Sequence, residues 1–423
     1  MNEKPLSAPD WQKEIYLNGF AGKRSPVKTS MQSLESEARQ CMSEKAYAYI
    51  AGGAGNESTM EANRKAFEQW KIVPRMLRNV AERDTSIELF GQKIPSPLLL
   101  SPVGVLEMVH PEADVAVAKA ASSLGVPYIF SNQASRPMEE CAAVMKDSPR
   151  WFQLYWSKSN ELVQSFVQRA ERCGCTALVV TLDTTLLGWR TRDLDLAYLP
   201  FLEGKGIAQY TSDPVFQKLL DEPDETPQVN RKITLQSIQG LISMVKNYPG
   251  NNFLSKLASG RPLKAVRKFV SIYSNPATTW EDLSFLRQQT KLPILLKGIV
   301  HPDDARKALD FGMNGMIISN HGGRQVDGSI ATLDALPKIA EVVQNKVPVL
   351  LDSGVRGGAD IFKALALGAK AVCIGRPYVY GLTIAEEQGV YEVMQNLMAD
   401  FELTMGLSGC KSIPEINPEM ITL

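Results

Sequence analysis

The sequence is poor in histidine and has no excess of charge of either sign. Only three of its 423 residues are histidine, and 46 basic side chains balance 46 acidic ones. A neutral balance gives no electrostatic basis for binding nucleic acid or an anionic membrane surface. We therefore expect no nucleic-acid or membrane partner, and so few histidines predict no metal site.

Cysteine motifs and long apolar runs are also lacking. The six cysteines are scattered, and Cys173 and Cys175 lack the CxxC spacing of zinc and redox motifs, so we expect reduced, buried thiols. The first residues, MNEKPLSAPDWQKEIY, contain no apolar signal core, and no run approaches the roughly 18 apolar residues of a membrane span. The sequence ends in ITL, not the peroxisomal SKL. These absences predict a cytoplasmic protein.

What the sequence does contain is a repeated unit of a short apolar run followed by a helical stretch. Each run ends in a polar residue or glycine, as expected for strands buried on both faces. The runs span 98–101, 128–131, 151–155, 177–181, 294–297, 316–319, 349–352 and 371–375. Eight such units predict an α/β protein with a (β/α)8 TIM barrel. A doubly wound open sheet is the alternative, but no GxGxxG follows the first run.

Helix signals follow several of these runs. Pro111 is placed for a first helical position, Ser159 for an N-cap, Pro302 for another helix start and Asp360 for a first turn. His110 and His301 both precede proline at helix starts, so we expect them to cap or pack.

The spacing of the run ends predicts the organisation of the chain. Neighbouring ends lie 22 to 33 residues apart, except for 116 residues between Thr181 and Lys297. We predict an N-terminal extension over 1–34, a barrel domain over 35–416 and a tail over 417–423. Within the barrel, 98–181 hold strands one to four, 182–292 an insertion, and 293–376 strands five to eight. Following strand four, the insertion would cover the active-site mouth as a lid. Residues before about 95 look helical, and we expect them beside or beneath the barrel.

The chemically strongest motif is SNHGGRQVDG at residues 319–328, just after the sixth run. An imidazole is a natural base near pH 7, and a guanidinium binds a carboxylate through two hydrogen bonds. His321 and Arg324 therefore suit deprotonation of a substrate that carries a carboxylate. Gln153 and Tyr155 alternate along one run, and Thr181 and Asp183 along the next, so each pair faces the interior. An aspartate near His321 would orient the imidazole.

Lys297 ends an otherwise apolar run and would point into the barrel mouth. Its ammonium could balance an anion that develops on a cofactor, or its amine could form a Schiff base. The loops after the last two runs, Asp352-Ser353-Gly354-Val355-Arg356-Gly357-Gly358 and Gly375-Arg376-Pro377, have the composition of the common barrel phosphate site. A phosphorylated cofactor or substrate is the prediction.

Together these motifs resemble the FMN-dependent L-2-hydroxy acid oxidases, the family of glycolate oxidase, lactate oxidase and flavocytochrome lactate dehydrogenase. FQLY, LLKG, SNHGGRQ, LDSGVRGG and IGRP occur in the family's order between about residues 35 and 416. The resemblance implies FMN as cofactor and an L-2-hydroxy acid and O2 as reactants. It also implies a homotetramer or homo-octamer. Since the N-terminal segment is short and CxxCH is absent, we expect no preceding haem domain.

The resemblance assigns roles to residues. His321 would be the base with Asp183 as its support, and Arg190 and Arg324 would clamp the substrate carboxylate. Tyr49 and Tyr155 would contact the substrate, and Lys297 the flavin N1 position. The remaining residues would bind FMN. Ser131, Gln153 and Thr181 would contact its pyrimidine edge, Pro102, Val103 and Gly104 its reactive face, and Ser319 its ring, while Asp352, Ser353, Gly354, Arg356, Gly375 and Arg376 would bind the ribityl chain and phosphate.

Within the family the sequence is most similar to the lactate 2-monooxygenases. TLDTTLLGWRTRDL, AYLPFLEG and SDPVF carry this likeness, as does Gly104, where simple oxidases usually have alanine. It implies that L-lactate and O2 give acetate, CO2 and water. Gln133 stands where oxidases often have an aromatic residue, which leaves the preferred acid open. An oxidase that releases the 2-keto acid and H2O2 remains an alternative, and so, more remotely, does a Schiff-base lyase using Lys297.

Overall fold

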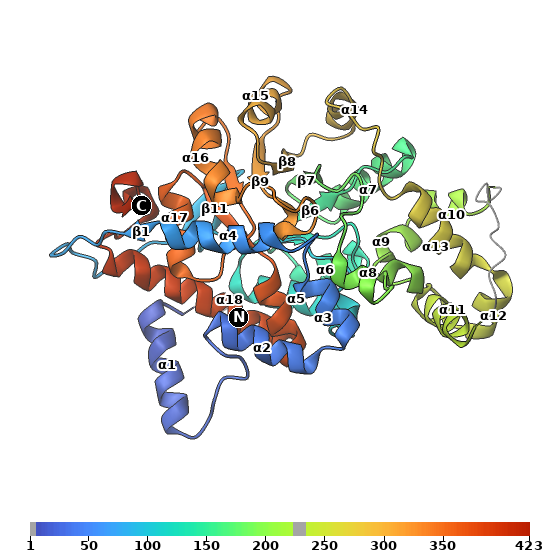
Figure 1. Ribbon diagram of the computed structural model, residues 1–423, viewed down its shortest axis with the longest axis horizontal. Helices are drawn as coiled ribbons and strands as arrows, with labels where there is room; N and C mark the ends of the chain where they lie inside the picture. Colours follow the sequence, from blue (N-terminus) through green and yellow to red (C-terminus); the bar gives the residue numbers. More distant parts are fainter. Residues whose placement is uncertain (1–5, 223–233) are drawn as a thin grey trace.

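The computed structural model describes residues 6–222 and 234–423, and its centre is a closed barrel of eight parallel strands (Figure 1). In order around the barrel these are β10 (Val349–Leu351), β11 (Ala371–Ile374), β4 (Leu98–Leu100), β5 (Tyr128–Phe130), β6 (Arg150–Leu154), β7 (Leu178–Thr181), β8 (Ile294–Ile299) and β9 (Gly315–Ile318). All eight predicted runs are strands, so the TIM barrel is confirmed.

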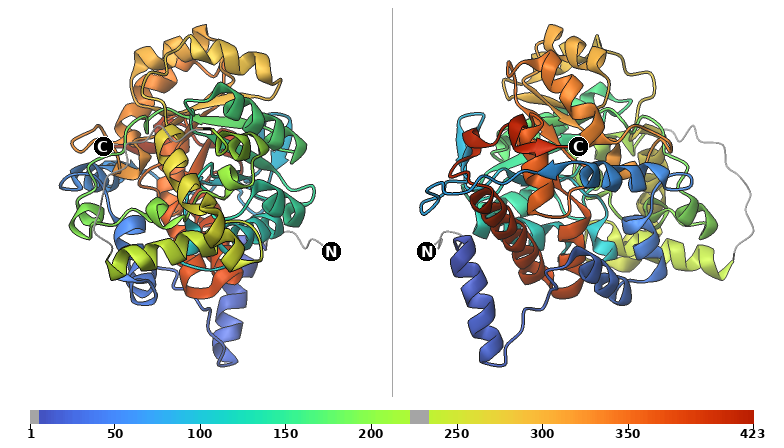
Figure 2. Two further views of the ribbon diagram at one scale, coloured as in Figure 1. Left: turned by 90° about the vertical axis from the view of Figure 1, so that its right-hand side faces the viewer. Right: turned by 60° about the vertical axis from the view of Figure 1, so that its left-hand side comes forward.

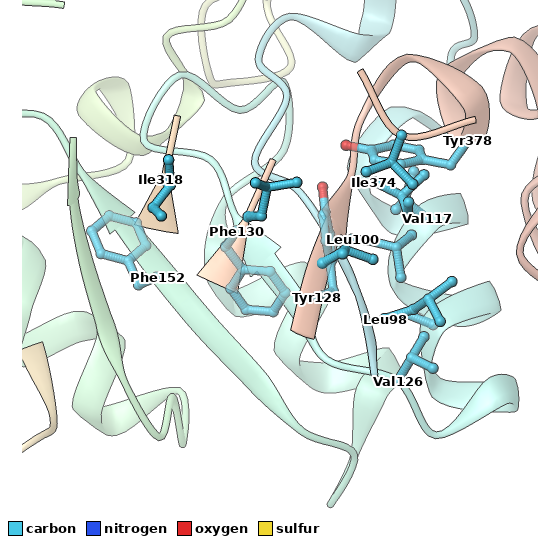
Figure 3. Packing of buried hydrophobic residues seen from close by; sticks show 14 of the residues in the cluster. Leu98, Leu100, Val117, Val126, Tyr128, Phe130, Phe152, Ile318, Ile374 and Tyr378 are labelled. Carbon is cyan, nitrogen blue, oxygen red and sulfur yellow. The ribbon is translucent and has the colours of Figure 1, made fainter. Parts of the chain in front are cut away.

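The strands are buried on both faces because alternate side chains pack into two different cores. Inward-facing residues such as Leu99, Ile129 and Ile317 fill the barrel. Outward-facing residues pack against the surrounding helices, as Figure 3 shows for Leu98 and Leu100 near Val117. This double burial explains why the runs are continuously apolar and do not alternate with polar residues.

One helix follows each strand in the outer ring. These are α5 (Ala113–Leu124), α6 (Met138–Met145), α7 (Asn160–Arg172), α14 (Asp282–Gln289), α15 (Pro302–Asp310), α16 (Thr332–Val343), α17 (Gly358–Ala366) and α18 (Arg376–Leu407). The Ser159 cap and the positions of Pro302 and Asp360 are confirmed. The placement of Pro111 is wrong, because Pro111 and Glu112 form a turn and α5 begins at Ala113.

The N-terminal segment is helical, as predicted, but it surrounds the barrel on more than one side. Helices α1 (Ala8–Phe20), α2 (Met31–Cys41), α3 (Glu44–Ala51) and α4 (Ser58–Gln69) lead to strand β1 (Lys71–Ile72), which pairs with β12 (Ile421–Thr422). Helix α1 packs on α18 and projects from the body (Figures 1 and 2). The hairpin of β2 (Ile87–Leu89) and β3 (Gln92–Ile94) joins the inner core at the strand beginnings, which is beneath the barrel.

Helices α3 and α4 lie at the opposite end, against the loops that follow the strands. Asn63 of α4 exchanges two hydrogen bonds with Asn320 after β9, at 2.9 and 2.8 Å. The prediction that the whole segment lies beside or beneath the barrel is therefore wrong for these two helices. Paired amides of this kind are a tertiary feature that the helical pattern does not encode.

The segment after β7 forms a separate layer of helices beside the barrel, facing the viewer in the left view of Figure 2. It contains α8 (Thr191–Asp195), α9 (Ala208–Thr211), α10 (Pro214–Leu219), α11 (Leu235–Asn247), α12 (Phe253–Ser259) and α13 (Arg261–Ile272), with the short 3-10 helix η2 (Pro200–Glu203). Helix α14, also within 182–292, packs against α7 in the ring. The additional layer therefore ends before α14. Part of the insertion, 223–233, lies outside the described residues.

Aromatic packing holds this layer together, and hydrogen bonds attach it to the barrel loops. Phe269 contacts Phe201, Tyr210 and Tyr273, with ring centroids 5.1, 4.8 and 5.1 Å apart. Tyr210 Oη donates to Asn132 Oδ1 over 2.9 Å, after β5. The backbone N–H of Gly206 donates to Glu107 Oε1 over 2.8 Å, after β4. The layer is thus fixed to loops at the carboxyl ends of two strands.

Within residues 6–222 and 234–423, no helix combines the length and the apolar character needed to cross a bilayer. The six cysteines are free thiols, as expected, but Cys41 is exposed and Cys173 only half-buried, so the expectation of burial is wrong for these two. His301 caps α15 and His110 Nδ1 accepts the backbone N–H of Glu112, which confirms their expected structural roles.

Candidate active site

A cavity lies at the carboxyl ends of the barrel strands, where catalytic sites of this fold are built. Fifteen of the predicted site residues line it: Tyr49, Pro102, Val103, Gly104, Tyr155, Arg190, Lys297, His321, Arg324, Asp352, Ser353, Gly354, Arg356, Gly375 and Arg376. They come from α3 and from the ends or following loops of seven strands. The barrel closes these segments, distant in the sequence, around one space.

The other five predicted residues lie behind the cavity wall. Asp183 and Ser319 are hydrogen-bonded to His321 and Lys297. Ser131, Gln153 and Thr181 form a chain across β5, β6 and β7, in which Ser131 Oγ donates to Gln153 Oε1 over 3.2 Å and Gln153 Nε2 donates to Thr181 Oγ1 over 2.9 Å. All three side chains are buried. These three residues form a row of polar groups at the carboxyl ends of β5, β6 and β7.

His321 and Asp183 form a buried pair. His321 Nδ1 lies 2.7 Å from Asp183 Oδ1 and 3.1 Å from Thr184 Oγ1, and Thr184 Oγ1 also donates to Asp183 Oδ1 over 2.9 Å. Burial is the largest influence on His321 and lowers its pKa below the usual 6.5, although Asp183 opposes this shift. The imidazole is therefore neutral near pH 7, and its Nε2 is left for substrate.

Asp183 stays ionised in spite of its burial. Burial acts to raise its pKa, but His321 and Lys297 outweigh it and lower the pKa to about 2. A carboxylate held in this way fixes the imidazole tautomer and stabilises the imidazolium that forms when the base accepts a proton.

Arg190 and Arg324 converge on the ring of Tyr49, with their guanidinium carbons 5.9 and 4.9 Å from its centroid. Arg324 Nη1 donates to the carbonyls of Tyr49 and Gly52. Burial, together with the repulsion of Arg190, lowers the pKa of Arg324 to about 9. Neither arginine forms an ion pair with any of the described residues. Asp193 acts on both charges without forming an ion pair with either, so the two cations still favour a carboxylate ligand here.

Lys297 is a buried ammonium held by acidic and hydroxyl groups. Its Nζ lies 3.1 Å from Asp352 Oδ2 and 3.9 Å from Asp183 Oδ2, and it donates to Ser319 Oγ over 2.8 Å. Burial by itself would lower the pKa of Lys297. The negative charges of Asp352 and Asp183 outweigh burial, so the pKa is raised above the usual value. Lys297 is therefore a fixed positive charge and a poor amine nucleophile.

The far end of the cavity carries two more buried arginines. Arg376 Nε and Nη1 donate to Ile50 O and Gly322 O over 3.0 Å each. Arg356 Nη1 donates to Val355 O over 2.9 Å. Burial lowers the pKa of both guanidinium groups, that of Arg356 to about 10. Their bonds go to neutral carbonyls, so this end suits a dianion such as a phosphate.

Several lining residues were missed by the sequence analysis, above all Phe201 and Tyr273 from the insertion. Burial raises the pKa of Tyr273, which lines the same cavity as Arg190 and Tyr49. No pattern in the sequence marks these residues, because only the folding of the insertion brings them to the cavity. Other missed residues had a local signal, among them Thr184 next to Asp183, Gly322 inside the SNHGGRQ motif, and Ser101 at the end of the first run.

Comparison with known proteins identifies the family. The model of the FMN-dependent dehydrogenases matches residues 38–423. The chain belongs to this family. It is 43% identical over 414 residues to the FMN-dependent α-hydroxy acid dehydrogenase qulF of Penicillium citrinum, covering 98% of this chain and 95% of the relative. It is 41% identical to an L-lactate oxidase of Lysinibacillus sphaericus, covering 87% and 86%.

A crystal structure of mandelate oxidase with (S)-4-hydroxymandelic acid superimposes with a TM-score of 0.76 at 33% identity, covering 93% of this chain and 98% of that one. This family member is thus an FMN-dependent 2-hydroxy acid oxidoreductase. The cavity fits FMN: the buried arginines suit its phosphate, the polar chain from Ser131 to Thr181 suits its pyrimidine edge, and Lys297 suits a ring that becomes anionic on reduction.

Proposed function

We propose that this chain oxidises L-lactate with O2 and decarboxylates the product, giving acetate, CO2 and water. The observation that carries the oxidation is the convergence of a neutral His321 with two unpaired arginines on one cavity. An L-2-hydroxy acid presents a carboxylate to the arginines and a hydroxyl to the base. Bound FMN supplies the two-electron acceptor.

Each side chain at the site has its own role in this reaction. Arg190 and Arg324 bind the carboxylate and thereby orient the substrate. Nε2 of His321 removes the hydroxyl proton, and Asp183 stabilises the resulting imidazolium. The hydroxyls of Tyr49 and Tyr155 contact the substrate; burial and Asp183 raise the pKa of Tyr155 to about 12, so it remains a hydrogen-bond donor.

Retention of the keto acid is the feature that separates the monooxygenase from the oxidase. Pyruvate and H2O2 that remain together give acetate, CO2 and water, and no further reactant is required. Phe201 and Tyr273 of the insertion line the cavity, and their presence supports retention of pyruvate. The lack of a side chain at Gly104 supports it as well. The backbone of Gly104 is not left-handed, so a need for unusual backbone angles does not account for this glycine.

An oxidase that releases pyruvate and H2O2 is the second candidate, and the relatives named L-lactate oxidase favour it. A Schiff-base lyase is disfavoured, because the raised pKa of Lys297 keeps its amine protonated.

Product analysis separates the two reactions. The enzyme is incubated with L-lactate in air, and acetate, CO2, pyruvate and H2O2 are measured. One acetate per O2 consumed supports the proposal, whereas one H2O2 and one pyruvate per lactate would make the chain an oxidase. Anaerobic reduction of the flavin by glycolate, lactate, 2-hydroxybutyrate and mandelate identifies the preferred acid; a strong preference for an acid other than lactate would reject lactate as the substrate.

A further inference from the structure

A second hollow adjoins the phosphate end of the cavity, between α2 and α4. It shares four lining residues with the active-site cavity: Gly322, Gly354, Arg356 and Arg376. Tyr380 of α18 also lines this hollow, one helical turn after Arg376. Tyr380 therefore shares this hollow with the two buried arginines, Arg356 and Arg376.

The hydroxyl of Tyr380 has no hydrogen-bond partner among the described residues. The side chain is 1% exposed, so solvent does not replace that partner. A buried hydroxyl without a partner destabilises the fold, because the water it loses on burial is not replaced. Tyr378, two residues earlier, shows the usual arrangement, because its Oη donates to Ser101 O over 2.8 Å.

The groups around Tyr380 explain what it lacks. Burial raises its pKa, and the charges that act on it most are those of Arg376, Glu35 and Arg356. The guanidinium groups have no lone pair to accept its proton. Glu35 accepts a hydrogen bond from Tyr47 Oη over 3.3 Å, and no hydrogen bond joins it to Tyr380. The missing partner is therefore an acceptor placed beside two cations, which is the chemistry of a phosphate oxygen.

We propose that Tyr380 binds the phosphate of FMN, its Oη donating a hydrogen bond to a phosphate oxygen that Arg356 and Arg376 also bind. The inference depends on the cofactor and not on the substrate or the products. It predicts that the Tyr380 hydroxyl contributes to affinity only when the flavin carries its phosphate.

The test compares two flavins on the apoprotein. Kd values for FMN and for riboflavin, which lacks the phosphate, are measured by flavin fluorescence for the wild type, Tyr380→Phe and Tyr378→Phe. Tyr380→Phe should weaken FMN by about tenfold and change riboflavin by less than about twofold, since a hydrogen bond to a charged group is lost only with FMN. Tyr378→Phe is the matched control, and it should change both flavins by the same factor.

Unchanged FMN affinity in Tyr380→Phe, or equal losses for FMN and riboflavin, would overturn the proposal. If that variant does not fold, 3-fluorotyrosine at position 380 keeps both the ring and the hydroxyl. Its 19F resonance should then shift on binding FMN and not on binding riboflavin, and the same shift with both flavins would overturn the assignment. None of these binding measurements requires turnover, so they remain valid even if the enzyme does not oxidise lactate.

Discussion

His321 and Asp183 lie 138 positions apart in the chain, and His321 Nδ1 is 2.7 Å from Asp183 Oδ1. The pair forms because β7 and β9 flank β8, so the residues after their carboxyl ends meet above that strand. This contact leaves Nε2 of the imidazole as the nitrogen that meets substrate. Several consequences can be measured.

Replacing His321 by glutamine should abolish flavin reduction by lactate and leave FMN bound. Loss of a general base costs ~10²–10⁴-fold or more. Stopped-flow measurement of anaerobic flavin bleaching gives the rate, and the absorbance spectrum gives the occupancy. His301→Gln, at the exposed cap of α15, is the control and should reduce normally. If His321→Gln still reduces the flavin at a near-normal rate, His321 is not the base.

The pH profile of kcat/KM should have an acid limb with its midpoint below 6.5. Burial lowers the pKa of His321, so the imidazole keeps its neutral, active form to a lower pH than a free histidine does. In Asp183→Asn the influence that raises this pKa is gone, so the limb should move to still lower pH. The maximal rate should fall by ~10-fold or more, because the imidazolium loses its support. A limb that moves upward would contradict this electrostatic account.

Arg190→Met and Arg324→Met should weaken substrate binding more than FMN binding. Removing one partner of a desolvated charge pair costs about 2–5 kcal/mol. Titration of the flavin absorbance with a non-reacting carboxylate analogue gives the Kd, and Arg306→Met, on exposed α15, serves as the control. If both cavity variants keep the wild-type Kd, the two arginines do not form the carboxylate clamp.

Arg376→Ala should purify depleted of FMN. The guanidinium is buried, and its hydrogen bonds go to the neutral carbonyls of Ile50, Gly322 and Gly52, so its charge remains available to the cofactor phosphate. The ratio of flavin absorbance to protein absorbance measures occupancy, with Arg306→Met again as the control. Full occupancy in Arg376→Ala would count against its phosphate role.

Gly104→Ala should divert the products toward pyruvate and free H2O2. A Cβ at this position would lie 2.9 Å from the carbonyl oxygen and 3.0 Å from Cβ of Gln133, which lines the same cavity. Gln133 must therefore shift, which reduces the room for pyruvate to remain while oxygen reacts. A peroxide assay together with acetate quantification, before and after the substitution, gives the partition. An unchanged ratio of acetate to pyruvate would show that Gly104 does not control retention.

The sequence by itself determined the barrel, because strands buried on both faces must be continuously apolar and the connecting helices carry local start signals. It also determined which loops carry functional groups, since residues that follow parallel strands all reach the same end of the barrel. For this reason the motif around His321, Lys297 in β8 and the glycine-rich loops after β10 and β11 could be identified from the sequence alone.

Only the tertiary structure decided the rest. The position of α3 and α4 across the mouth depends on contacts such as Asn63 with Asn320, between residues 257 positions apart. Phe201 and Tyr273 reach the cavity through aromatic packing inside the insertion, and such packing has no fixed sequence period. The neutral imidazole of His321 and the charged amine of Lys297 are set by burial and by nearby carboxylates. Those distances exist only after the chain has folded.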